Sequence, residues 1–153
     1  MKPTNRPSRR ASAARANRIG TLAAATLFAL SVLPSAATAR NEEVATAPSG
    51  VTFVSGGISS DAVDRLRSME RDFNLKMVFA SSNGEYLSDV RVQVVDPSNR
   101  VVLDTLTEGP WLLAKLPPGS YQVNASYGRS IERRTVAVAP AALKTLDFRW
   151  ATE

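Results

Sequence analysis

The sequence predicts an all-β domain of seven short antiparallel strands, preceded by one short amphipathic helix. Two observations carry this prediction. Between residues 74 and 150, runs of β-branched and aromatic residues recur about every 8 to 12 residues, and Gly, Pro, Asn or Asp separates one run from the next. Such spacing is typical of a sandwich or barrel, because parallel strands need crossover helices for which these intervals are too short.

Residues 1–39 have the pattern of a signal peptide. The first eighteen residues hold six basic side chains and no acidic one, and the next fifteen carry no charge. That uncharged run is shorter than the roughly 20 residues of a membrane-spanning helix, and Pro34 follows it. Residues 37–39 match the A-x-A cleavage signature. We therefore expect cleavage before Arg40, with an uncleaved anchor as the alternative.

Cleavage would change the charge of the protein. The whole chain has 19 Lys and Arg against 14 Asp and Glu, and six of the basic residues precede Arg40, which leaves 13 basic and 14 acidic residues and a formal charge of −1. We expect no nucleic-acid binding, which requires a retained basic surface, and no membrane span after cleavage. The destination is the periplasm or the exterior; general export is expected, and the pair Arg9 and Arg10 leaves the twin-arginine route open.

The residue types present argue against most catalytic chemistry. The chain has no cysteine and no histidine. It therefore lacks disulfides, a thiol nucleophile, the Cys and His ligands of zinc sites and the commonest general base. The acidic residues Asp89, Asp96, Asp104 and Glu108 lack the spacing of a calcium loop. We expect no enzyme, no cofactor and no metal site.

Residues 40–58 are predicted to form a flexible leader, because they are rich in polar residues, Pro and Gly. Gly56 and Gly57 would be its joint to the rest of the chain. Within it, residues 51–54 have the composition of one short edge strand.

Residues 59–73 are predicted to form the amphipathic helix. Apolar side chains follow one another at spacings of three and four, and Ser60 or Asp61 is available as the N-cap. A helix of about three turns is marginal alone in water, so we expect it to dock on an apolar surface. The apolar positions are Val63, Leu66, Met69 and Phe73.

Residues 74–150 are predicted to form the β-sandwich domain. In the first strand, Leu75, Met77 and Phe79 occupy every second position, so their side chains share one face of the strand. We expect that face to lie in the core. The second and third strands form a hairpin around an Asp-Pro turn. The strands are expected at 75–80, 90–94, 101–106, 111–116, 121–127, 131–138 and 143–150.

One motif gives a family resemblance. The segment 116–121 resembles the L-P-P-G-x-Y signature of carboxypeptidase regulatory-like domains. Its signature residues are Leu116, Pro117, Pro118, Gly119 and Tyr121. Residues 55–150 as a whole look like small exported proteobacterial proteins that carry such a domain. The resemblance implies a seven-stranded, prealbumin-like Greek-key β-sandwich, a fold also seen in collagen-adhesin B-type repeats, and a non-catalytic role.

The resemblance and the residue inventory together predict an exported module that binds or scaffolds another envelope protein through loops or an edge strand. The candidate contact residues are Glu85, Tyr86, Gly109, Pro110 and Trp111. The alternative partner is a polysaccharide, bound by a carbohydrate-binding module whose aromatic side chains contact the sugar. The aromatic residues available for it are Tyr86, Trp111, Tyr127 and Trp150.

Two further likenesses are considered and not adopted. Collagen-adhesin repeats often carry a Lys to Asn or Asp isopeptide bond, for which Lys76 and Asp147 would be the partners and Glu108 the assisting acid. The alternation places Lys76 and Asp147 away from their apolar neighbours, facing solvent, so we expect no crosslink. Residues 127–130 are similar to the terminal Tyr-Arg-Gly-Ser of transthyretin-like hydroxyisourate hydrolases. Their order differs and no histidine is present, so they are predicted to form a hairpin turn.

Overall fold

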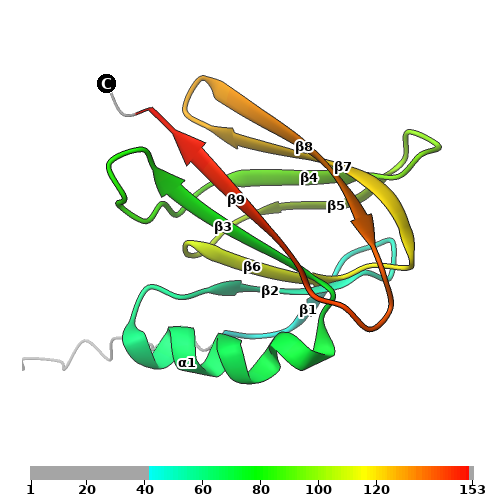
Figure 1. Cartoon of the computed structure of the whole chain (residues 1–153), viewed down its shortest axis with the longest axis horizontal. Helices are drawn as coiled ribbons and strands as arrows, with labels where there is room; N and C mark the ends of the chain where they lie inside the picture. Colours follow the sequence, from blue (N-terminus) through cyan, green and yellow to red (C-terminus); the bar gives the residue numbers. More distant parts are fainter. Residues whose placement is uncertain (1–41, 152–153) are drawn as a thin grey trace, which may run out of the picture. The chain divides into compact units, whose positions relative to one another are not determined.

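Two β-sheets and one short helix account for most of the described chain (Figure 1). The computed structural model describes residues 42–151, so the predicted signal peptide and its cleavage site lie outside the described residues. The all-β prediction with a single short helix is confirmed. Within residues 42–151, no helix has the length and apolar character needed to cross a membrane.

The first sheet has five strands, which lie in the order β1, β2, β6, β3, β9. Their bounds are β1 Ala45–Thr46, β2 Thr52–Gly56, β6 Trp111–Lys115, β3 Leu75–Ser81 and β9 Lys144–Trp150. The second sheet has four strands in the order β5, β4, β7, β8. Their bounds are β5 Val101–Leu106, β4 Arg91–Val95, β7 Gly119–Tyr127 and β8 Ser130–Val138.

All seven predicted strands are present, but the described residues hold nine strands, not seven. The two additional strands, β1 and β2, come from residues assigned to the flexible leader. β2 includes most of the short strand expected at 51–54, and it pairs with β1 on one side and β6 on the other, so it is not an edge strand. Phe53 and Val54 supply the apolar side chains that hold it on the sheet.

The prediction of purely antiparallel pairing is wrong for one pair, because β9 runs parallel to β3. Parallel neighbours need a long connection. Here the chain between them passes through β6 and all four strands of the second sheet, and β9 returns to the first sheet beside β3.

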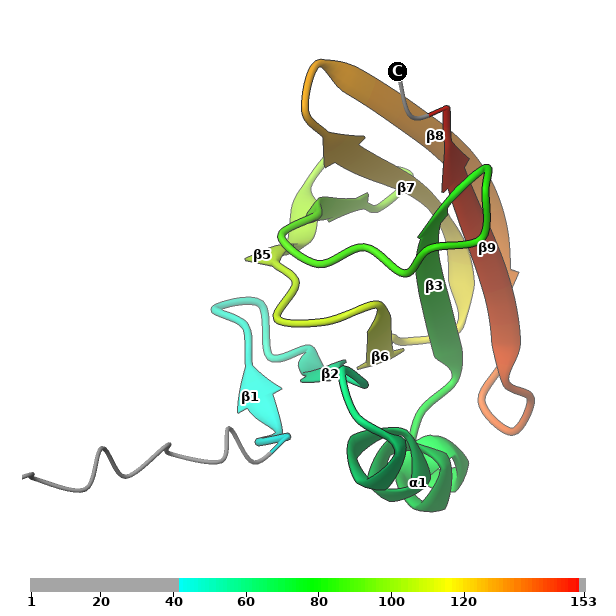
Figure 2. The same cartoon turned by 90° about the vertical axis from the view of Figure 1, so that its left-hand side faces the viewer.

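The core lies between the two sheets (Figure 2). The alternation read from the sequence is observed, with Leu75, Met77 and Phe79 buried in it. The facing sheet contributes residues such as Val94 and Val123. β6 has four consecutive buried residues, because one of its faces meets this core and the other lies under the helix.

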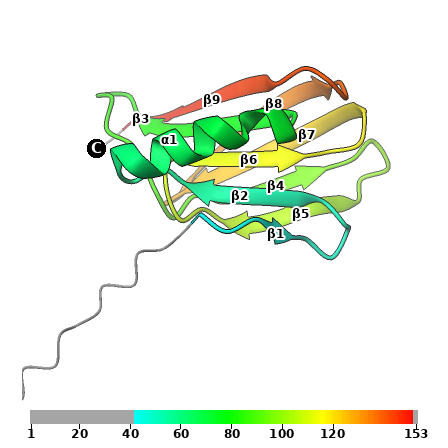
Figure 3. The same ribbon diagram turned by 90° about the horizontal axis from the view of Figure 1, so that it is seen from below.

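The helix α1 spans Ser60–Met69 and continues into a short 3-10 turn, Glu70–Asp72. It lies over the outer face of the five-stranded sheet (Figure 3), where Leu66 packs with Trp111 and Leu113 in a second apolar cluster. The cap differs from the prediction: the Ser59 Oγ accepts a hydrogen bond from the Ala62 backbone N–H at 3.2 Å. Ser59 precedes the first helical residue, which is the position that requires a capping acceptor.

Candidate functional site

Three loops lie at one end of the molecule, and hydrogen bonds join two of them to each other and to the strands β2 and β3. They are residues 56–59, 82–90 and 107–110, and we call them the loop end. The Asp89 N–H donates a hydrogen bond to the Thr107 carbonyl at 2.9 Å, and the Phe79 N–H donates to the Pro110 carbonyl at 2.9 Å. The Glu108 N–H donates to the Ser55 Oγ at 3.0 Å. These bonds hold the loops in fixed relation to the sheets.

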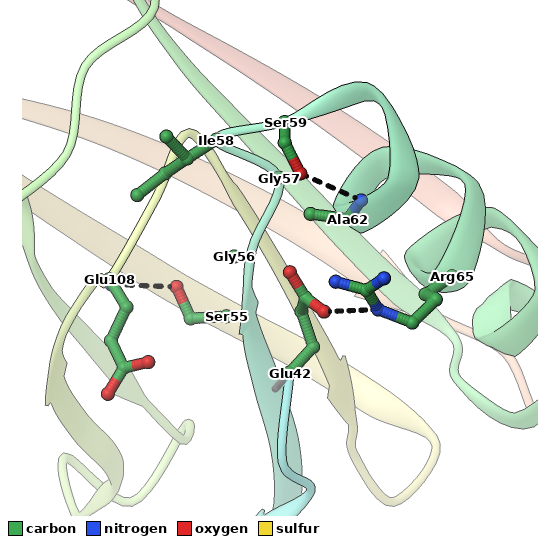
Figure 4. Close-up of a pocket in the computed structure, with 9 residues that line it drawn as sticks. All are labelled: Glu42, Ser55, Gly56, Gly57, Ile58, Ser59, Ala62, Arg65 and Glu108. Atoms are coloured by element: carbon green, nitrogen blue, oxygen red, sulfur yellow. Dashed lines mark hydrogen bonds and ion pairs between the residues drawn. The ribbon is translucent and has the colours of Figure 1, made fainter. Parts of the chain in front are cut away.

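A pocket of about 260 Å³ opens at this end, beside the start of α1 (Figure 4). Side chains of the first helical turn, of β2 and of the loop at 108 surround it. The lining residues are Glu42, Ser55, Gly56, Gly57, Ile58, Ser59, Ala62, Arg65 and Glu108. Ile58 lies at its edge and is 73% exposed, the largest exposed fraction among the exposed large hydrophobic residues of the described chain.

Glycines allow close approach of the backbone in and beside the pocket. A Cβ on Gly109 would lie 2.3 Å from the Gly56 carbonyl oxygen, and a Cβ on Gly56 would lie 2.5 Å from the Glu42 Cγ. Both distances are too short for any side chain. Gly57 has a φ of +91°, a conformation that glycine adopts without strain. Glycine at these positions therefore lets the chain segments approach one another at the loop end.

Glu42 and Arg65 form the charged part of the site. The Arg65 Nε donates to the Glu42 Oε2 at 2.7 Å, and the Glu42 side chain is 5% exposed while that of Arg65 is 51% exposed. Burial alone would raise the pKa of the Glu42 carboxyl. Hydrogen bonds from Arg65 and from the Gly57 backbone, with the positive charge of Arg65, outweigh that effect and lower the pKa below its usual value. The carboxylate is therefore held ionised in a nearly buried position.

The structure divides the five predicted contact residues. Glu85 is exposed and Tyr86 is 65% exposed, both in the 82–90 loop. Gly109, Pro110 and Trp111 are buried. Their prediction as contact residues is corrected on this point, because a residue without accessible surface cannot touch a partner.

Trp111 is a core residue beneath the helix. It is 6% exposed, and the Lys76 Nζ lies 3.6 Å from the centroid of its ring. Lys76 also binds the Glu70 Oε1 at 2.6 Å. Lys76 does point away from the main core, as the alternation predicts, but it faces the helix layer and not open solvent.

The residues considered for an isopeptide bond are not paired with each other. In the parallel register, Lys76 lies opposite Thr145, and Asp147 lies opposite Val78. The Lys76 amine is occupied by Glu70 and by the Trp111 ring. Glu108 belongs to the pocket at the loop end.

The aromatic residues available for sugar binding are mostly covered. Trp150 is 3% exposed and packs against Phe79 and Phe148, so neither tryptophan presents a ring face. Tyr86 and, in part, Tyr127 remain at the surface. Two separate tyrosines do not make a stacking platform, and the carbohydrate alternative loses its main support.

The L-P-P-G-x-Y motif has a structural role. The Tyr121 hydroxyl donates to the Pro117 carbonyl at 2.7 Å, as expected for a tyrosine that reaches loop backbone. The buried Asn74 side chain accepts from the Leu116 N–H at 2.9 Å and donates to the Leu116 carbonyl at 2.7 Å. The motif is therefore fastened at both ends. It connects the end of β6 to the start of β7, whereas the 107–110 loop precedes β6.

Sequence reasoning did not find Glu42 and Arg65 as site residues. They lie 23 residues apart, one in the supposed leader and one on the polar face of the helix. The only local signal was the Gly56-Gly57 pair, which indicated a joint and not a pocket floor. Within residues 42–151, no group of three or more carboxylates gathers into a metal-binding cluster.

Comparisons with known proteins add no identity. No protein-family model matches the chain, and no curated protein sequence matches it significantly.

Proposed function

We propose that this chain is an exported, non-catalytic β-sandwich module that binds another protein of the cell envelope through its loop end. The observation that carries the proposal is the exposure of Ile58 and Tyr86 on two loops at the same end of the fold, with Ile58 at the edge of a pocket of about 260 Å³. Exposed apolar side chains next to a concave site are typical of protein-binding surfaces.

The finer assignment of the fold belongs to the same proposal. We infer a prealbumin-like Greek-key sandwich related to carboxypeptidase regulatory-like domains. The fastening of Tyr121 to Pro117 and the two-sheet arrangement support it. Such domains act as rigid scaffolds, and a rigid scaffold with functional loops at one end suits a binding module.

Photo-crosslinking in the native envelope tests the function. A photoreactive residue at position 58 or 86 should give the same adduct, while one at Val101 should not. Val101 is a matched control because it is also apolar and exposed. It pairs with Val95 at the end of β4, whereas the 82–90 loop precedes the start of β4.

The protein identified in the adduct is then purified and titrated. Ile58→Asp should weaken binding at least about tenfold with an unchanged melting temperature, because a charge would be desolvated in an apolar contact. Val101→Asp should leave the affinity unchanged. Adducts at all three positions, or equal affinities for both variants, would show that the loop end is not the binding surface.

A further inference from the structure

Residues 42–46, which we call the strap, run along the outer side of β2. Ala45 pairs with Phe53 and Thr46 pairs with Thr52 in antiparallel register. The same register, continued toward the amino terminus, places Glu42 opposite Gly56. The position of the Glu42 Cγ above Gly56 agrees with this placement.

The far end of the strap is held by its carboxylate. The Arg65 guanidinium and the bare surface of Gly56 together form a cradle for a glutamate on an extended chain. Any residue other than glycine at position 56 would fill the space that the glutamate side chain occupies. The cradle is thus specific for a carboxylate that arrives along the β2 edge.

The strap is held much less firmly than the chain that follows it. Only two residue pairs form between β1 and β2, and residues 43–46 are all exposed. By contrast, Ala47 and Val51 are buried in the main core, and the Ser49 hydroxyl donates to the Val102 carbonyl. The strap can therefore separate from β2 at the bond between Thr46 and Ala47 while the 47–51 loop stays in place.

We propose that the strap is the internal occupant of a strand-acceptor site, and that an extended acidic segment of the partner protein replaces it, with a glutamate in the cradle. This inference rests on the proposed function and names the chemistry of its partner. A partner strand can pair with all five residues of β2, whereas the strap pairs with two. The additional main-chain hydrogen bonds supply affinity, and the cradle supplies selectivity for a carboxylate. A swapped strap from a second copy is disfavoured, because the anchored 47–51 loop would have to open.

A labelled peptide of residues 41–47 serves as the probe. Its titration uses the chain from Arg40 onward, which includes all of the residues that the structure describes. A Glu42→Gln chain should bind the peptide about tenfold more tightly than the unaltered chain, because the internal competitor is weakened. Arg65→Gln in the same Glu42→Gln background should bind at least about tenfold less tightly, since the cradle has lost its cation.

Two controls make the result specific to the cradle. Arg67→Gln changes another exposed arginine of α1, one that pairs with Asp64, and should alter peptide affinity less than about twofold. A peptide whose first glutamate is replaced by glutamine should bind the Glu42→Gln chain weakly. Its affinity should be the same when Arg65→Gln is added to that chain. The Gly57 amide resonance should shift on binding of the original peptide.

Three outcomes would overturn the inference. They are no peptide binding by the Glu42→Gln chain at millimolar concentration, equal binding with and without Arg65, and a concentration-dependent dimer that forms through exchanged straps. None of them affects the crosslinks expected at positions 58 and 86. Conversely, absence of those crosslinks with peptide binding intact would remove the proposed function and leave the acceptor site.

Discussion

Trp111 shows how one residue can be read in two ways. It follows the Gly109-Pro110 pair and opens the strand predicted at 111–116, so its ring could either contact a partner or lie in the core. In the structure it is the first residue of β6, and the helix covers it. Its ring is enclosed by Leu66 and Phe73 and by the amine of Lys76. Its function is therefore to hold the helix on the sheet.

Trp111→Ala is expected to destabilise the fold by about 3 to 5 kcal/mol, because it leaves a large cavity between helix and sheet. Urea unfolding followed by circular dichroism measures this loss. Tyr86→Ala, a truncation of an exposed aromatic, should stay within about 0.5 kcal/mol of the unaltered chain. Unchanged stability of the Trp111 variant would contradict its assignment to the core.

Glu42 should make stability depend on pH in the acid range. Its pKa is lowered in the folded state by Arg65 and the Gly57 N–H despite burial, so the unfolded state binds its proton more readily. The stabilisation is therefore fully present above the usual glutamate pKa of about 4.3 and is lost as the pH falls through the lower folded value.

The measurement compares the free energy of unfolding of the unaltered chain and the Glu42→Gln variant. The difference should be largest at neutral pH and should disappear in strong acid. A difference that does not change with pH would mean that the ion pair with Arg65 contributes nothing to the folded state.

At the scale of elements, the helix depends on its cap and on its docking surface. Alone, ten helical residues are marginal in water, and the cluster under α1 supplies the missing stability. The cap is Ser59, one residue before Ser60 and two before Asp61, the two candidates that the sequence pattern indicated. The difference arises because Ser59, Ser60 and Asp61 all carry suitable acceptors, and only the backbone conformation selects among them: Ser59 is extended, with φ −116° and ψ 163°.

Ser59→Ala should therefore cost about 1 kcal/mol of stability, since the Ala62 N–H loses its acceptor. Ser60→Ala is the matched control and should change stability by less than about 0.5 kcal/mol. Thermal melts of the two variants decide the position of the cap. A larger loss for the Ser60 variant would restore the cap that the sequence pattern predicted.

At the scale of the whole molecule, the fold is a layered structure without covalent staples among the described residues. Its stability comes from the core between the sheets and the smaller cluster under the helix. The described residues hold 12 basic and 13 acidic side chains, a formal charge of −1. Nucleic-acid binding requires basic residues clustered on one surface. After residue 39, the basic residues of this sequence are interleaved with acidic ones.

The intact mass of the purified chain should equal the mass of its sequence. Lys76 is engaged by Glu70 and lies two register positions away from Asp147 on the neighbouring strand, so no amide forms between them. Mass spectrometry of the purified protein measures this directly. A mass lower by one water or one ammonia would show a crosslink and would contradict the assignment. Lys76→Arg, which cannot form the bond, provides the reference.

The seven strands and the helix of the main domain could be predicted because they depend on local pattern. Alternating apolar side chains and regularly placed turn residues record which positions are buried, and burial is the main contribution to folding.

Long-range pairing was decided only by the tertiary structure. β9 lies parallel to β3, β2 pairs with both β1 and β6, and Trp111 is covered by the helix. Glu42 and Arg65 meet across 23 residues. None of these has a local signature, because strand order and ion pairing depend on which surfaces meet after the chain has collapsed, and many pairings satisfy the same alternation. The sequence by itself therefore determined the elements and the class of fold, while the packing of those elements created the pocket, the cradle and the strap.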